Sequence, residues 1–369
     1  QPGELGEKGV TVTTQGTAAG LVDWRTVERL SALIPAGPSA SRSARASSVA
    51  VLRRSAQEAP AWVARITGLN RAAQQVAEST RVSVVDRAGL VRASTRALRG
   101  LMEQVPAPRA SEAIQLVGAA EIAGAMSLLA TRLLGQVVPA APSGPHGHGA
   151  GAADAAPPAG EGADDAAPAT APSRDVTMGA GWDGAASPHL LLVAPNVLAV
   201  RRQMDLDMLD LPAWVCLHEM THAVQLAAAP WLGPYLSDSM RMVIGAVVEA
   251  VYGGADGAGG TSPRGRGSLP RRGRAVRLAA RAGRGRVLES LMNVTDRAEV
   301  ASLAAALTFL EGHAEVVLDD VHPNRMPSVH RLRAVLSRSR AADGGIGPGP
   351  GLGSLLLHRL MGLEAKEAQ

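Results

Sequence analysis

The pentapeptide HEMTH at residues 218–222 constrains the fold and chemistry of this chain more than any other stretch. Histidines four residues apart lie on the same face of a helix, so His218 and His222 can both reach one metal ion. Glu219 points to the neighbouring face, close enough to take a proton from a metal-coordinated water. The pattern therefore predicts a helix that carries two zinc ligands and a general base.

The sequence around this motif indicates that the helix is buried. Residues 211–229 contain no helix breaker after Pro212, which lies in the first turn; Asp210 is the expected N-cap and Pro230 follows the end. Apolar residues occupy nearly every side, as is typical of a buried helix. Two imidazoles and a carboxylate are costly to bury unless they are paired or bound to metal. Core histidines bonded to backbone carbonyls would account for one histidine but not for the triplet.

A second helical segment, residues 303–320, is the best candidate region for a third metal ligand. It is strongly apolar, yet it carries Glu311, Glu315 and Asp319 at successive four-residue steps. A stripe of carboxylates on an apolar helix suits a surface that faces a metal and its surroundings. A solvated acidic face would be the alternative, but the rest of the segment is too apolar to favour it.

Several motifs taken together resemble the zincin-like metallopeptidase type 2 family, whose members are often described as associated with biosynthesis of the deazaflavin coenzyme factor 420. The matching stretches lie at residues 22–24, 63–69, 84–87, 190–198, 214–225, 230–232 and 310–314. The resemblance runs from about Leu21 to about Arg333 and is interrupted by two inserts. It implies a mostly helical zincin of actinobacterial, intracellular origin, with no recognisable deazaflavin-binding motif.

The resemblance also implies the third ligand. Glu311 followed by Gly312 resembles the Glu-Gly segment of glutamate-type zincins, in which the small glycine lets the second helix approach the first closely. Glu311 is therefore the expected ligand, and His313 and Glu315 are the alternatives.

The expected reaction is hydrolysis of a peptide or protein. Zinc held by His218, His222 and Glu311 would leave one position for water and lower its pKa from ~16 toward ~7. Glu219 would accept the proton and return it to the leaving amine. An additional oxyanion donor stays open among four residues: Tyr235, Tyr252, His313 and His330. A catalytically silent zinc scaffold is the alternative, but a purely structural site has no use for a general base.

The composition predicts a mainly α fold, because alanine, leucine and arginine dominate and 46% of the 369 residues are hydrophobic. Helices are expected over residues 22–34, 49–67 (with a kink or break at Pro60), 71–79, 87–104 and 111–134, with a loop at 38–48. Strands are expected at 81–85 and 190–193. The second strand lies near the metal helix and is the candidate edge strand of a substrate cleft.

The expected organisation is an N-terminal helical part at residues 1–134, an insert at 135–187 and a zinc-binding part at 188–369. The insert is rich in Ala, Pro, Gly and Asp and is expected to be disordered. A second insert at 253–286 carries nine arginines, which supports a rival hypothesis of nucleic-acid association. It lacks interleaved aromatic residues for base stacking, so a solvated basic loop is favoured over nucleic-acid binding.

The remaining features favour a cytoplasmic protein. Cys216 is the single cysteine and cannot form an internal disulfide, which fits a reducing compartment; we expect it to be a core residue. No continuous apolar run approaches the ~20 residues that cross a bilayer, and residues 1–10 lack the layout of a signal peptide. The net charge of +4 implies no partner by itself, and the oligomeric state stays open.

Overall fold

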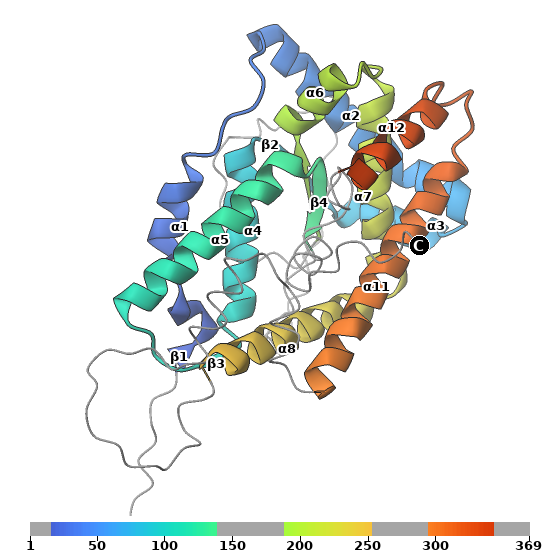
Figure 1. The fold of residues 1–369 in the computed structure, drawn as a ribbon. Coiled ribbons are helices and arrows are strands. Elements are labelled where there is room, and N and C mark those ends of the chain that lie inside the picture. The colour runs from blue at the N-terminus through green and yellow to red at the C-terminus, as the bar shows by residue number, and fades with distance from the viewer. Residues whose placement is uncertain (1–15, 139–187, 253–293, 343–369) are drawn as a thin grey trace, which may run out of the picture.

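The computed structural model describes residues 16–138, 188–252 and 294–342, and within them it is mainly helical, as the composition predicts (Figure 1). The helices are, in chain order, η1 (Ala18–Leu21), α1 (Trp24–Ser31), α2 (Arg42–Thr67), α3 (Asn70–Ser79), α4 (Arg87–Met102), α5 (Glu112–Arg132), α6 (Ala194–Gln203), α7 (Asp210–Ala228), α8 (Leu232–Tyr252), α11 (Val294–Asp319) and α12 (Val329–Ala342). The strands are β1 (Gly16–Thr17), β2 (Arg81–Val85), β3 (Pro106–Ala107), β4 (Gly135–Val138) and β5 (His189–Val193).

A three-stranded sheet in the order β2-β5-β4 lies at the centre of the molecule. β5 runs parallel to β2 and antiparallel to β4. Leu190 and Leu192 of β5 belong to a core shared with α2 and α7, whereas Leu191 and Val193 pack with α4 and α5. Figure 1 shows the sheet between these two groups of helices. A strand buried on both faces must be apolar at every position, which explains the unbroken run of leucines.

The position of β5 overturns one expectation. β5 is the central strand and pairs on both sides, so it cannot offer a backbone edge to a substrate. Among the described strands of this sheet, β4 is the edge strand that packs against α7. β4 itself occupies the first residues of the segment 135–187, for which disorder was the expectation. The rest of that insert and the basic insert 253–286 lie outside the described residues.

The local signals that begin α7 differ from those expected. The N-cap is Leu209 and not Asp210, and the turn before the helix is held by the Asp207 carboxylate, which accepts the backbone N–H groups of Leu209 (2.7 Å) and Asp210 (3.0 Å). Asp210 lies in the first turn and accepts the backbone N–H of Ser328 at 2.7 Å. Its carboxylate therefore ties α7 to the start of α12.

α2 begins earlier than its sequence suggested, at Arg42, and ends at Thr67 as expected. The expected loop at 38–48 is wrong beyond Ser41, whose hydroxyl accepts the N–H of Ala44 (3.1 Å) and caps the helix. The helix also continues through Pro60, where a kink or break was expected, so the break does not occur. Its buried face packs along α7, and this burial outweighs the ~3 kcal/mol that an internal proline costs.

Two helices, Glu112–Arg132 and Thr295–Asp319, are long and apolar enough to cross a membrane by length and composition alone. Neither contains a continuous apolar run of ~20 residues, as expected, but their isolated charges leave the mean hydropathy high enough to meet this criterion. In the fold, the first packs against α1 and α4 and the second against α7 and α8.

Candidate metal centre

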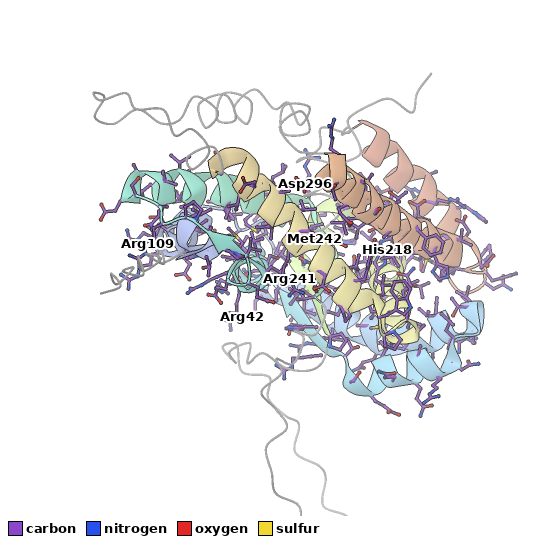
Figure 2. All side chains as sticks on the ribbon, turned by 90° about the horizontal axis from the view of Figure 1, so that it is seen from below. Arg42, Arg109, His218, Arg241, Met242 and Asp296 are labelled. Atoms are coloured by element: carbon purple, nitrogen blue, oxygen red, sulfur yellow. The ribbon has the colours of Figure 1, made fainter. Side chains whose placement is uncertain are left out.

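α7 and α11 bring His218, His222 and Glu311 together. The Nε2 atom of His218 lies 3.3 Å from Glu311 Oε2, and Nε2 of His222 lies 3.5 Å from Glu311 Oε1. The two Nε2 atoms are 3.3 Å apart. Within the described ranges, this is the one group of three or more His, Cys, Asp or Glu ligand atoms spaced to share a metal ion. Figure 2 shows His218 on the α11 side of the molecule.

The donor atoms of this cluster fit a zinc ion. Nitrogen and oxygen ligands bind zinc at ~2.0–2.2 Å in tetrahedral geometry, which places neighbouring ligand atoms ~3.3–3.5 Å apart. The two Nε2 atoms are separated by 3.3 Å, and the distances from them to the nearer Glu311 oxygen, Oε2 for His218 and Oε1 for His222, are 3.3 and 3.5 Å, which match this spacing. Two imidazoles and one carboxylate are also a donor set typical of catalytic zinc, which keeps a fourth position for water or substrate.

The packing of the two rings holds this arrangement. Trp214 stacks on His218 with ring centroids 5.5 Å apart and planes inclined by 11°. The His222 ring meets His218 edge-on, with centroids 4.9 Å apart. His218 is almost completely buried, so its orientation is set by the core of α7.

The charges in the cluster favour a bound cation. Burial lowers the pKa of His222, but the hydrogen bond and negative charge of Glu311 outweigh burial and raise this pKa from 6.5 to about 9. Burial raises the pKa of Glu311, but hydrogen bonds from His218 and His222 outweigh it and hold this pKa well below 4.5. In the absence of metal the site therefore keeps a proton between an imidazole and a carboxylate.

Glu219 is buried beside the cluster and has a raised pKa, chiefly because burial disfavours its charged form. It packs against Gly135, the first residue of β4. A Cβ atom at position 135 would lie 2.7 Å from Glu219 Cγ and 3.0 Å from its Cδ. Position 135 therefore has room for the carboxylate only because it is a glycine.

Sequence reasoning missed Gly135. A short apolar run with a glycine near its centre, residues 133–138, is a weak strand signal that was present in the sequence. The contact with Glu219 depends on the antiparallel pairing of β4 with β5, which no local pattern reveals.

The alternative ligands lie outside the cluster. Nδ1 of His313 is hydrogen-bonded to Nε2 of Gln225 at 2.8 Å, and Glu315 is not part of the cluster. The third carboxylate of the expected stripe, Asp319, pairs with Arg333. Gly312 is exposed, and a Cβ there would meet nothing within 4 Å. The expectation that this glycine permits the close approach of the two helices is therefore wrong.

The remaining candidates are also placed by the structure. Tyr235 packs edge-on against Trp231 at 6.1 Å, and His330 is exposed on α12, while the Tyr252 side chain lies outside the described part. Cys216 is completely buried, and burial raises the pKa of its thiol, as befits a core residue.

A two-histidine, one-glutamate cluster with a buried carboxylate beside it is typical of a metal-dependent hydrolase. The sequence profile of the zincin-like metallopeptidase family matches residues 22–369, and the chain belongs to this family. A crystal structure from Chloroflexus aurantiacus, described as that of a "putative hydrolase with a novel fold", is similar with a TM-score of 0.49 and 18% identity, over 94% of this chain and 83% of that one. None of the curated proteins compared matches the chain.

Proposed function

We propose that this protein is a zinc-dependent peptidase in which His218, His222 and Glu311 hold the metal and Glu219 is the general base. The observation that carries the proposal is the convergence of two imidazoles and one carboxylate: the two Nε2 atoms lie 3.3 Å apart, and each lies 3.3–3.5 Å from one of the two oxygens of Glu311. One ligand atom from each residue lies within 4.8 Å of the other two, close enough for all three to share a zinc ion. Membership of a zincin-like metallopeptidase family supports the same chemistry.

A bound zinc ion would supply Lewis acidity at this site, toward a water nucleophile and a substrate carbonyl. Glu219 supplies what the ligands cannot, a carboxylate that can both take and return a proton. Its burial raises its pKa, which makes it a stronger base than an exposed carboxylate. Glu219 lies on α7 next to His218, and the packing of β4 on α7 fixes its carboxylate, since the glycine at position 135 leaves room for it.

β4 supports a peptide as the substrate. An extended peptide can bind by adding a strand to a free sheet edge, with its backbone hydrogen-bonded to the edge strand. In the described sheet β4 occupies the edge nearest α7, and its first residue contacts Glu219. A peptide bound along β4 would thus pass the general base.

A catalytically silent zinc scaffold is less well supported. A structural site needs ligands only, and it gains nothing from a buried carboxylate with a raised pKa next to them. The position of Glu219 therefore favours catalysis.

The test uses the purified full chain and three measurements. Elemental analysis should return close to one zinc per chain. A diverse peptide mixture analysed by mass spectrometry should show cleavage that a chelator abolishes. Glu219→Gln should keep its zinc and lose turnover by about 10²–10⁴-fold, the usual contribution of a general base.

Glu315→Gln is the matched control, because it makes the same change on α11 outside the cluster. It should cleave at the wild-type rate. Undiminished cleavage by Glu219→Gln would overturn the role of the base. A zinc-loaded wild-type protein that hydrolyses simple esters but no peptide would overturn the substrate class.

A further inference from the structure

Gln225 connects both metal-binding helices through one buried side chain. It lies on α7, three residues after His222, and is 8% exposed. Its Oε1 atom is 2.9 Å from Nδ1 of His222. Its Nε2 atom is 3.0 Å from the carbonyl oxygen of Leu310 and 2.8 Å from Nδ1 of His313, both on α11.

The Leu310 carbonyl determines the orientation of this carboxamide. A carbonyl oxygen can only accept a hydrogen bond, so the group that faces Leu310 must be the NH₂ of Gln225. The amide oxygen then faces His222, and since it can also only accept, Nδ1 of His222 must carry a proton.

The same reasoning places the proton of His313. The second N–H of Gln225 points to Nδ1 of His313, which must accept it. The proton of a neutral His313 ring therefore lies on Nε2. One backbone carbonyl thus fixes the hydrogen-bonding roles of two imidazoles on two different helices.

We propose that Gln225 is a positioning residue that fixes the tautomer and ring orientation of His222, so that Nε2 presents its lone pair to the metal. This inference rests on the proposed metal site. Metal-bound histidines usually donate their second ring N–H to a carbonyl or carboxylate, which orients the ring and raises its basicity. Here the carboxamide of Gln225 takes that role, and its own orientation is secured from α11.

The two histidine ligands are held in different ways. The His218 ring is fixed by stacking on Trp214 in the buried interior of α7. His222 is more exposed, at 15% of its side chain, and outside the cluster its ring makes a polar contact with Gln225. The hydrogen bond therefore supplies at His222 the constraint that packing supplies at His218.

The experiment measures zinc affinity by competition with a chelator, using the full chain. Gln225→Met keeps the length of the side chain and removes every hydrogen bond; zinc should bind about 10–100-fold more weakly, the usual effect of losing such a partner. Gln225→Glu keeps an acceptor for His222 but loses both donors to α11. It should stay within a few-fold of wild-type affinity, while its metal-free form unfolds at a lower temperature.

Gln115→Met is the matched control, because its carboxamide donates to the Gly20 carbonyl at 3.0 Å, away from the metal ligands. Its zinc affinity should not change. Nitrogen-15 NMR of the zinc-loaded wild-type protein should also show a ring N–H assigned to Nδ1 of His222. This measurement needs no variant to fold.

Each other outcome overturns the inference in a distinguishable way. Wild-type affinity in Gln225→Met shows that Gln225 does not position the ligand. Equal weakening in Gln225→Glu and Gln225→Met shows that Gln225 only tethers α11. A proton on Nε2 of His222 in the zinc-loaded protein contradicts the tautomer. Absence of zinc binding by the wild-type chain overturns the proposed function itself, and this inference with it.

Discussion

α7 and α11 supply all the atoms of the metal cluster, yet the fold holds them in different ways. Of the 19 residues of α7, 14 are buried, including both neighbours of the HEMTH motif. α11 is longer and has few buried residues, namely Val300, Leu303, Ala314, Val317 and Leu318. Between Leu303 and Ala314 its contacts with α7 include polar ones, from Glu311, Leu310 and His313.

The two helices therefore differ in how much their position depends on the metal site itself. The core around α7 fixes the His218 imidazole and the Glu219 carboxylate whether or not a metal is bound. The segment of α11 that faces them is held in part by the site's own hydrogen bonds and ion pairs. We therefore expect changes in α7 to affect folding and chemistry together, and changes in α11 to affect the site with less effect on the fold.

The largest effect should come from removal of a ligand. His222→Ala on α7 and Glu311→Ala on α11 should each weaken zinc binding by more than about 100-fold, which exceeds the effect of losing an outer hydrogen-bond partner. Chelator competition measures the affinity, and circular dichroism checks that each variant folds. Full zinc binding by Glu311→Ala, together with loss of zinc in His313→Ala, would move the third ligand to His313.

A methyl group added at β4 should affect catalysis without affecting the metal. Gly135→Ala would place Cβ 2.7 Å from Glu219 Cγ, so the carboxylate must shift. A displacement of about 1 Å at a reacting group can cost ~10²-fold in rate. Steady-state cleavage and elemental analysis measure the two properties. Gly233→Ala, where a Cβ meets nothing within 4 Å, is the control. Parallel losses of zinc and activity in Gly135→Ala would show that β4 supports the ligands instead of the base.

The two helices should also differ in their sensitivity to truncation. Leu217→Ala removes a side chain that is 1% exposed on α7 and should lower the free energy of unfolding by about 2–5 kcal/mol. Phe309→Ala removes a side chain that is 72% exposed on α11 and should change the free energy of unfolding by less than about 0.5 kcal/mol. Urea unfolding of both variants measures the difference. Similar losses would mean that the outer face of α11 is covered in solution.

The smallest effect concerns the stability of the metal-free protein. The pKa of His222 is raised from 6.5 to about 9 in the folded state, so His222 contributes to the free energy of unfolding. This contribution is complete below pH 6.5 and is lost as pH rises through 9. The pKa of Glu311 is lowered in the folded state, so Glu311 contributes to the free energy of unfolding above pH 4.5, and this contribution is lost as the pH falls further. The raised pKa of Glu219 also makes the folded state less stable as pH rises.

Thermal unfolding after chelation should therefore give a higher midpoint near pH 6 than near pH 9. Glu311→Gln should reduce this difference, because it removes the charge that raises the pKa of His222. Added zinc should stabilise the protein more at the higher pH, since binding releases a proton. A metal-free midpoint that rises between these pH values would contradict the assigned charges.

The sequence predicted best what depends on neighbours along the chain. The spacing of His218 and His222, the burial of α7 and the limits of β2 all follow from local periodicity. Glu311 was assigned from a resemblance, and the structure brings its carboxylate to both histidines.

What the sequence could not predict depends on pairing between distant segments. The roles of Gly135 and Gln225 exist only once β4 and α11 pack against α7. The edge position was assigned to β5 because its leucines form the most obvious strand, although a run apolar on both faces indicates a central strand. Pro60 was taken as a kink or break because propensity alone ignores the packing of α2 along α7; α2 continues as a helix through this residue.

The pairing of β5 with β2 has a consequence for how the protein folds. Their partners, from Arg81↔His189 onward, are separated by roughly a hundred residues of intervening chain. Pairing of strands so far apart in the sequence is slow, because the chain loses conformational entropy on closing the loop before the strand contacts stabilise it. Glu219 gains its neighbour Gly135 only when β4 docks beside β5. The environment that makes this carboxylate a strong base should therefore be among the last parts of the molecule to assemble.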